Sequence, residues 1–66
     1  MRITVNGESH ELAAALSVDE LLQELRVPAT RVAVEINEEV VPRDTYSRRR
    51  LAAGDRVEIV HFVGGG

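Results

Sequence analysis

The one stretch of helical periodicity in this chain, between Ser17 and Leu25, constrains its fold more than any other feature. Ser17 can accept a hydrogen bond from a first-turn amide, and Glu20, three residues later, can close a capping box. Apolar residues then recur at helical spacing beneath a polar face; they are Val18, Leu21, Leu22 and Leu25. With Pro28 as its terminator, the pattern predicts one amphipathic helix of about ten residues.

Most of the remaining chain alternates with the period of two that is typical of half-buried strands. Predicted strands cover residues 2–5, 8–12, 31–36, 40–41 and 56–63. Asn6-Gly7 predicts a tight hairpin, because both residues tolerate the positive φ of a type I′ turn. Tyr46 and Leu51 are expected to pack the polar connection near residues 43–50 onto the core. We therefore predict an α+β fold, a mixed sheet with one main helix packed across it.

Composition narrows the possible functions. The chain has 66 residues, only 3% of them aromatic, and no cysteine, so aliphatic packing must hold it together without disulfides or a thiolate nucleophile. So short a chain can hardly enclose a catalytic pocket of roughly 300 Å³ or more. A net charge of −3 argues against nucleic acid, and the Arg48–Arg50 run is more typical of a solvated turn. We expect a cytoplasmic binding or carrier module that is not an enzyme and has no metal, no bound cofactor and no membrane partner.

The last predicted strand carries more apolar residues than a core requires. Val57 and Ile59 suffice on its inner side, which leaves Val60 and Phe62 without an obvious buried partner. Phe62 could equally cover the edge of the sheet. Exposed apolar side chains are also typical of a surface that a partner covers. We predict Val60 and Phe62 as partner-binding residues.

Three glycines, Gly64, Gly65 and Gly66, follow this strand. Glycines have no side chain to pack, so we expect a domain at residues 1–63 followed by a flexible tail at 64–66. Extended, the tail spans roughly 10 Å and fits a channel too narrow for any Cβ. The Gly66 carboxylate is a poor electrophile and needs activation, for example as a mixed anhydride with a nucleotide phosphate. A partner must supply that activation, because the chain has no phosphate-binding glycine loop.

Taken together, these features resemble the ThiS family of sulfur carrier proteins of thiamine biosynthesis, within the ubiquitin-like β-grasp ThiS/MoaD group. The resemblance covers essentially the whole chain. It rests on the Asn6-Gly7 hairpin, the capped helix, residues 34–43, residues 54–59 and the final glycines. Residues 37–43 are its most specific part, whereas a diglycine alone would be a weak signal. The implied fold is a ubiquitin-like β-grasp.

The resemblance also implies a mechanism. A ThiF-type enzyme adenylates Gly66 with ATP, and a donor such as a cysteine desulfurase supplies the sulfur of a thiocarboxylate. A thiazole synthase of the ThiG type then receives that sulfur. Gly65 and Gly66 match the diglycine of the family, Gly64 adds a third glycine to the recognised tail, and Val60 and Phe62 fall where partners of the family bind.

Three alternatives stay open. A carrier of the same fold could serve molybdopterin synthesis, transfer-RNA thiolation or cysteine synthesis, although the chain length and residues 37–43 favour the thiamine branch. A ubiquitin-like modifier would instead join Gly66 to lysines of target proteins. An interaction domain with an inert tail would function without Gly65 and Gly66.

Overall fold

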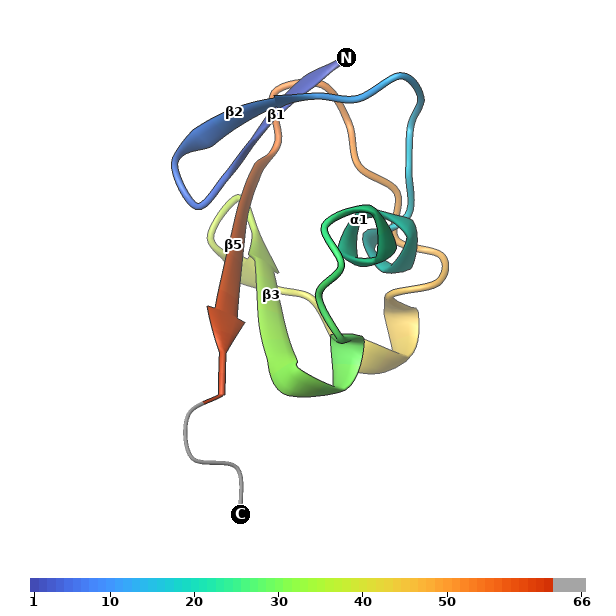
Figure 1. The fold of residues 1–66 in the computed structure, drawn as a ribbon, viewed down its shortest axis with the longest axis vertical. Coiled ribbons are helices and arrows are strands. Elements are labelled where there is room, and N and C mark those ends of the chain that lie inside the picture. The colour runs from blue at the N-terminus through green and yellow to red at the C-terminus, as the bar shows by residue number, and fades with distance from the viewer. Residues whose placement is uncertain (63–66) are drawn as a thin grey trace.

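The fold is a five-stranded mixed sheet with one helix packed across it, in a computed structural model that describes residues 1–62 (Figure 1). The strands are β1 (Arg2–Val5), β2 (Glu8–Glu11), β3 (Val32–Ile36), β4 (Glu39–Val40) and β5 (Arg56–His61). The helix is α1 (Val18–Glu24), and two 3₁₀ turns are η1 (Ala29–Arg31) and η2 (Arg43–Thr45). The sheet order β2-β1-β5-β3-β4 places the last strand at the centre, parallel to β1 and antiparallel to β3. The predicted α+β architecture is confirmed.

The β1–β2 hairpin turns at Asn6 and Gly7, whose φ angles are 50° and 83°. Both angles are positive, as a two-residue type I′ turn requires. The Asn6 side chain also reaches β5, because its amide donates to the Ile59 carbonyl over 3.2 Å and its oxygen accepts from the Ile59 amide over 2.7 Å. The predicted turn therefore joins its hairpin to the central strand as well.

The predicted capping box begins α1. The Glu20 amide donates to the Ser17 hydroxyl over 3.1 Å, and the Ser17 amide donates to the Glu20 carboxylate over 2.8 Å. Both bonds satisfy backbone or side-chain groups that a bare helix start would leave unpaired. Buried residues of the helix are Val18, Leu21 and Leu22.

The end of α1 differs from the prediction. The helix has seven residues and ends at Glu24, because Arg26 adopts a φ of 58° and turns the chain back. The Arg26 amide donates to the Gln23 carbonyl over 3.0 Å, and the Val27 amide donates to the Leu22 carbonyl over 2.9 Å. These two bonds form a Schellman motif, in which glycine is the usual left-handed residue. The helix thus ends at Glu24 through this motif, before the chain reaches Pro28.

A second tight turn, Asn37-Glu38, joins β3 to β4 with φ angles of 52° and 69°. The Asn37 side chain bridges to the start of β5, donating to the Asp55 carboxylate over 3.1 Å and accepting from the Arg56 amide over 2.9 Å. The turn pairs Ile36 with Glu39, so β4 lies at 39–40 instead of the predicted 40–41.

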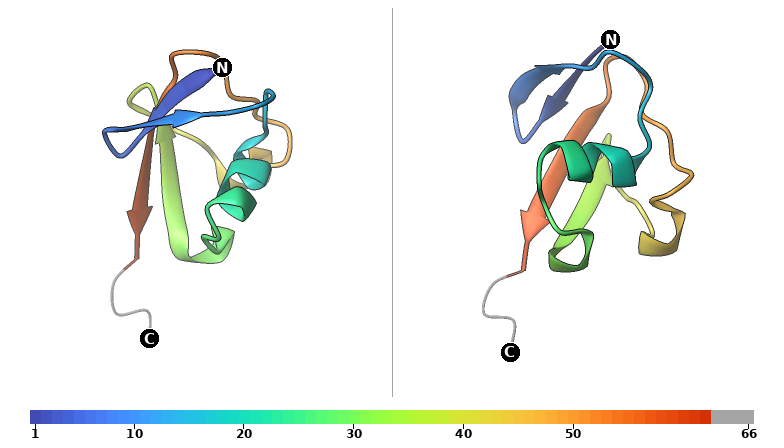
Figure 2. Two further views of the ribbon diagram at one scale, coloured as in Figure 1. Left: turned by 45° about the horizontal axis from the view of Figure 1, so that its top comes forward. Right: turned by 45° about the vertical axis from the view of Figure 1, so that its right-hand side comes forward.

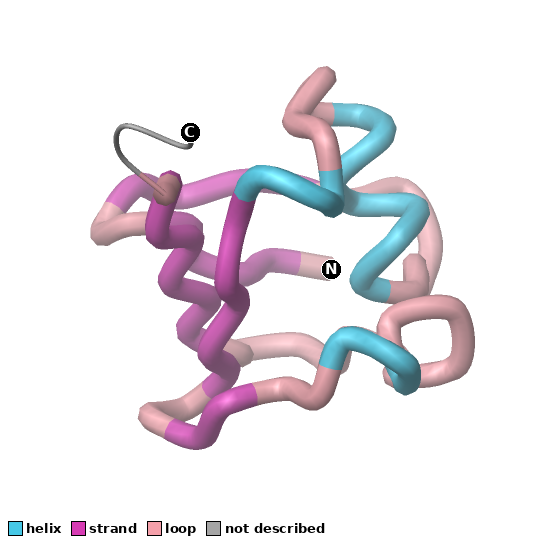
Figure 3. Tube along the Cα trace, turned by 90° about the horizontal axis from the view of Figure 1, so that it is seen from below, coloured by secondary structure: helices cyan, strands magenta, loops and turns pink. Residues whose placement is uncertain are grey.

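The core lies between α1 and the sheet face that α1 covers, as the two layers in Figures 2 and 3 show. Its buried apolar residues come from β1, α1, β3, β5 and the connecting segments: Ile3, Val5, Leu12, Val18, Leu21, Leu22, Val32, Val34, Ile36, Val41, Tyr46, Leu51, Val57 and Ile59. Tyr46 and Leu51 are buried as predicted, so the polar connection between β4 and β5 is fixed to the core at two points. Leu25, which the helical pattern placed in the core, is only partly buried against it.

Among the described residues, β5 ends at His61, short of the predicted end at Val63. The Phe62 amide donates to the Arg31 carbonyl over 3.0 Å, and Arg31 belongs to η1 instead of a strand. Ladder pairing therefore stops where β3 begins, at Val32 opposite His61. Val63 lies outside the described residues.

Candidate functional site

Val60 and Phe62, the two predicted partner-binding residues, are both exposed, with 54% of each accessible to solvent. Val60 lies on the sheet face that points away from α1, between the inward-facing Ile59 and the end of β5. Phe62 follows β5 at the rim of the sheet. Exposed apolar side chains of this size are suited to contact with another protein, and their role stays a prediction.

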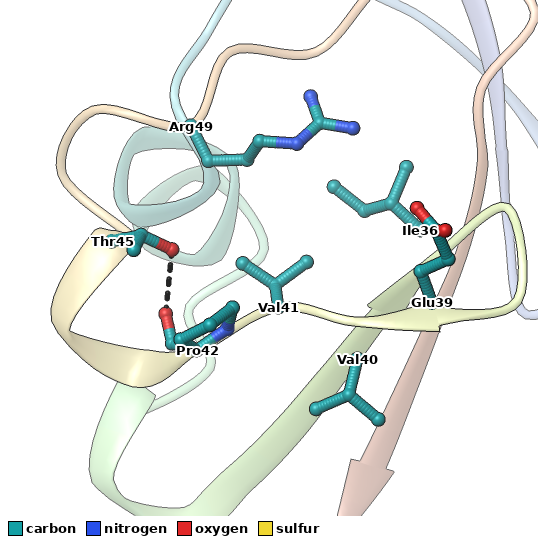
Figure 4. Close-up of a pocket in the computed structure, with 7 residues that line it drawn as sticks. All are labelled: Ile36, Glu39, Val40, Val41, Pro42, Thr45 and Arg49. Carbon is teal, nitrogen blue, oxygen red and sulfur yellow. Dashed lines mark hydrogen bonds between the residues drawn. The ribbon is translucent and has the colours of Figure 1, made fainter.

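Val40 is a third exposed apolar residue, which the sequence analysis did not single out. It is 71% exposed on β4, where it pairs with Glu35 of β3. Figure 4 shows Val40 and the buried Val41 pointing to opposite sides of the chain. Consecutive side chains of an extended segment point to opposite sides, so Val40 and Val41 cannot both face the core, and this alternation was the available signal.

The strand register defines the surface to which Val40 and Val60 belong. Glu35 pairs with both Val40 and Glu58, and Ala33 pairs with Val60, so five side chains share the face opposite α1. We call Ala33, Glu35, Val40, Glu58 and Val60 the outer patch. It crosses the three strands β4, β3 and β5 beside the chain segment that leads to the terminal glycines.

Arg43 contacts Phe62 at the rim of the sheet. Its guanidinium donates to the carbonyls of Ala29 and Val32, the latter over 2.9 Å. The guanidinium carbon lies 5.9 Å from the centre of the Tyr46 ring and 6.0 Å from that of the Phe62 ring, within the range of cation–π contacts. Phe62 is therefore held by its amide and its ring, yet remains half exposed. Arg43 joins η1, β3 and η2 to the last described residue.

A shallow hollow lies between β4 and η2 (Figure 4). Its volume is about 90 Å³, and it is lined by Ile36, Glu39, Val40, Val41, Pro42, Thr45 and Arg49. Small-molecule sites usually measure about 300–1,000 Å³, so this hollow cannot enclose a substrate. Arg49 is half-buried beside it, whereas Arg48 and Arg50 are exposed, as the solvated-turn interpretation expects.

Among residues 1–62, two carboxyl groups have clearly shifted pKa values, and both serve local structure. A hydrogen bond and the charge of the terminal ammonium, 2.9 Å away, lower the pKa of Glu11. The Ser17 amide that completes the capping box lowers the pKa of Glu20, with a smaller contribution from Arg50. Neither carboxyl belongs to the outer patch.

Among residues 1–62, no three histidine or acidic side chains gather as a metal site would require. No helix in the same part of the chain is long and apolar enough to cross a membrane. The predicted reactive residue Gly66, and the tail residues Gly64 and Gly65, lie outside the described residues. The structure therefore describes the domain as far as Phe62, two residues before the first of these glycines.

Comparison with known proteins assigns the family. The model of the ThiS family matches residues 3–66 of this chain. The chain belongs to the ThiS family. Sulfur carrier protein ThiS of Escherichia coli K12 is 30% identical over 66 residues, which cover all of both chains. The crystal structure of the thiamine biosynthesis protein ThiS from Geobacter metallireducens aligns over the whole of both chains, with 40% identity and a TM-score of 0.87.

A larger protein also contains a related segment. Thiazole synthase of Paramagnetospirillum magneticum is 44% identical over all 66 residues, but this chain spans only 20% of that protein. Membership of the ThiS family, with the structure it shares with the Geobacter protein, assigns a β-grasp fold to this chain.

Proposed function

We propose that this chain carries sulfur as a thiocarboxylate on Gly66 and delivers it for thiazole formation. The observation that carries the proposal is the family match, which runs through the final glycines to residue 66. The chain itself is a carrier and the substrate of an ATP-dependent activating enzyme of the ThiF type. ATP binds to that enzyme, and the carrier needs no cofactor of its own. Because the reaction consumes ATP, we place the carrier in the cytoplasm.

The chemistry proceeds in two displacements at the end of the chain. A carboxylate oxygen of Gly66 attacks the α-phosphorus of ATP, and pyrophosphate leaves. Sulfide then attacks the acyl carbon, AMP leaves, and the thiocarboxylate forms. When the donor is a persulfide on an enzyme such as a cysteine desulfurase, the same attack gives an acyl disulfide, and a thiol must reduce this disulfide to release the thiocarboxylate. The mixed anhydride makes the acyl carbon electrophilic, which a free carboxylate is not. Glycine leaves this carbon unhindered on both sides.

Val60 and Phe62 provide the contact with the activating enzyme, and Gly64 and Gly65 pass through its channel. The exposure of Val60 and Phe62 supports this assignment, because both apolar side chains are accessible before any partner binds. Tail residues without Cβ atoms suit a narrow channel. Neither task requires the core residues, so the domain and its tail have separable functions.

The sulfur acceptor in this proposal is a thiazole synthase of the ThiG type. The identity of 44% with a segment of a thiazole synthase supports it, since that protein contains a sequence like this carrier. A second such match, 44% identical over 66 residues, comes from the thiazole synthase of Magnetococcus marinus.

Intact-protein mass spectrometry tests the loading reaction. The chain is incubated with a ThiF-type enzyme, ATP and sulfide, and we expect one oxygen to be replaced by one sulfur at Gly66. The matched controls are deletion of Gly66 and addition of one alanine after it, because both leave residues 1–62 intact. Sulfur on the extended variant would refute the proposal. So would an unmodified wild-type chain beside an enzyme that is active on its own carrier.

A further inference from the structure

Two glutamates lie directly opposite each other in the middle of the outer patch. Glu35 on β3 and Glu58 on β5 are partners in the antiparallel register, and both project from the face opposite α1. The ion pairs of residues 1–62 involve Glu11, Glu20 and Glu38, and neither Glu35 nor Glu58 takes part. The nearest basic residue along that face of β5, Arg56, is paired with Glu38 at 3.6 Å.

This arrangement does not serve the fold. Like charges directly opposite each other on neighbouring strands are unfavourable. The core lies on the other face, where Val34 pairs with Ile59 and Ile36 pairs with Val57. Glu58 is exposed and Glu35 is half-buried, and a pair of polar, uncharged side chains would occupy these two positions at lower cost to the isolated domain.

Exposed apolar side chains flank the acidic pair. Val40 pairs with Glu35 from one side, and Val60 follows Glu58 by two residues on the same face. They are 71% and 54% exposed, respectively. Apolar surface with a few charged groups at fixed positions is typical of protein interfaces, where charge complementarity selects the partner.

We propose that Glu35 and Glu58 together bind a basic side chain of the activating enzyme, while apolar residues of that enzyme cover Val40 and Val60. An arginine fits best, because its planar guanidinium presents several donors and can bond two carboxylates at once. This inference rests on the proposed function and adds the chemistry of the partner surface. Docking then neutralises a repulsion that the free carrier retains.

The test compares two double variants with the same change of charge. Glu35→Gln with Glu58→Gln removes the acidic pair, and Glu8→Gln with Glu24→Gln is the control. Glu8 lies on the edge strand β2 and Glu24 on α1, and neither forms one of the described ion pairs. Each double variant changes the net charge from −3 by two units, to −1.

We expect opposite effects of the first variant on stability and on binding. Its melting temperature should equal or exceed that of the wild type, while its Kd for the ThiF-type enzyme, measured by calorimetry, should rise about tenfold or more. The dependence of that Kd on salt should also become shallower. The control should bind within about twofold of the wild type, because its charges lie outside the interface.

Each result separates this inference from the function on which it rests. If the wild type is loaded with sulfur and both double variants bind as well as it does, the acidic contact is wrong and the carrier function stands. A lower melting temperature of the Glu35/Glu58 variant would also overturn the inference, because the pair would then stabilise the fold. An unloaded, unbound wild type beside an active enzyme would refute both.

Discussion

Replacement of Phe62 by alanine tests whether the rim of the sheet serves binding or folding. Full burial of a phenylalanine side chain contributes about 1.5–3 kcal/mol, and slightly more than half of Phe62 is exposed, so its burial contributes about 1 kcal/mol. Its ring lies 6.0 Å from the guanidinium carbon of Arg43, and such an exposed cation–π contact adds about 0.5–1 kcal/mol. We therefore expect Phe62→Ala to lower the free energy of unfolding by about 1–2 kcal/mol.

A phenylalanine in a packed core would cost about 3–5 kcal/mol on the same replacement. Urea denaturation measures the change in the free energy of unfolding between the wild type and Phe62→Ala. Far-ultraviolet circular dichroism is the suitable signal, since the chain has no tryptophan and a single tyrosine for fluorescence. The rate of sulfur loading by a ThiF-type enzyme, measured on the same samples under folding conditions, should fall clearly.

Leu22→Ala is the matched control for Phe62→Ala. Leu22 is 1% exposed on α1, so its truncation should cost about 2–5 kcal/mol through the cavity it leaves. The folded fraction of that variant should nevertheless load sulfur at the wild-type rate, because Leu22 is remote from the outer patch. A loss above about 3 kcal/mol for Phe62→Ala, with loading unchanged, would refute the binding role.

Two further predictions concern the ends of α1. Arg26→Gly should raise the free energy of unfolding by about 0.5–1 kcal/mol, because φ is 58° at this residue. The strain of a side chain at this φ exceeds the extra conformational entropy that glycine loses on folding. A lower melting temperature of the variant in thermal denaturation would contradict this prediction. Glu20 has a pKa below the ordinary 4.5, chiefly through the hydrogen bond from the Ser17 amide. Its carboxyl group therefore binds a proton more weakly in the folded state than in the unfolded state. Its contribution to stability is therefore complete above pH 4.5 and is lost as the pH falls through the lower, folded pKa. Glu20→Gln keeps an oxygen for the Ser17 amide but cannot titrate, so its stability should fall less steeply on acidification in denaturation series; a slope equal to that of the wild type would exclude this role.

Local signals predicted most of the fold. The Asn6-Gly7 turn, the Ser17–Glu20 capping box and the burial of Tyr46 each depend on residues close in sequence or on a plain apolar pattern, and the structure confirms all three. The end of α1 was predicted wrongly because Pro28 is a strong helix breaker in sequence, whereas a left-handed Arg26 has no sequence signature.

The parts of the site that escaped prediction depend on contacts between distant segments. Arg43 was recognisable as part of a family segment, but its bonds to Ala29 and Val32 and its contact with Phe62 require the packing of η1, β3 and η2. The opposition of Glu35 and Glu58 depends on the register between β3 and β5, which no local pattern specifies. The chemistry of Gly66, which the terminal glycines and the family resemblance predict, stays a prediction.

The two faces of the sheet have different roles in this domain: one packs the core, and the other carries the outer patch. Residues that specify the fold lie on the face that α1 covers, in the tight turns and at the ends of α1, where they bury apolar surface or satisfy backbone groups. The outer patch contributes none of these contacts: its two glutamates are register partners, and Val40 and Val60 remain exposed. Substitutions in the outer patch should therefore change partner choice with little loss of stability.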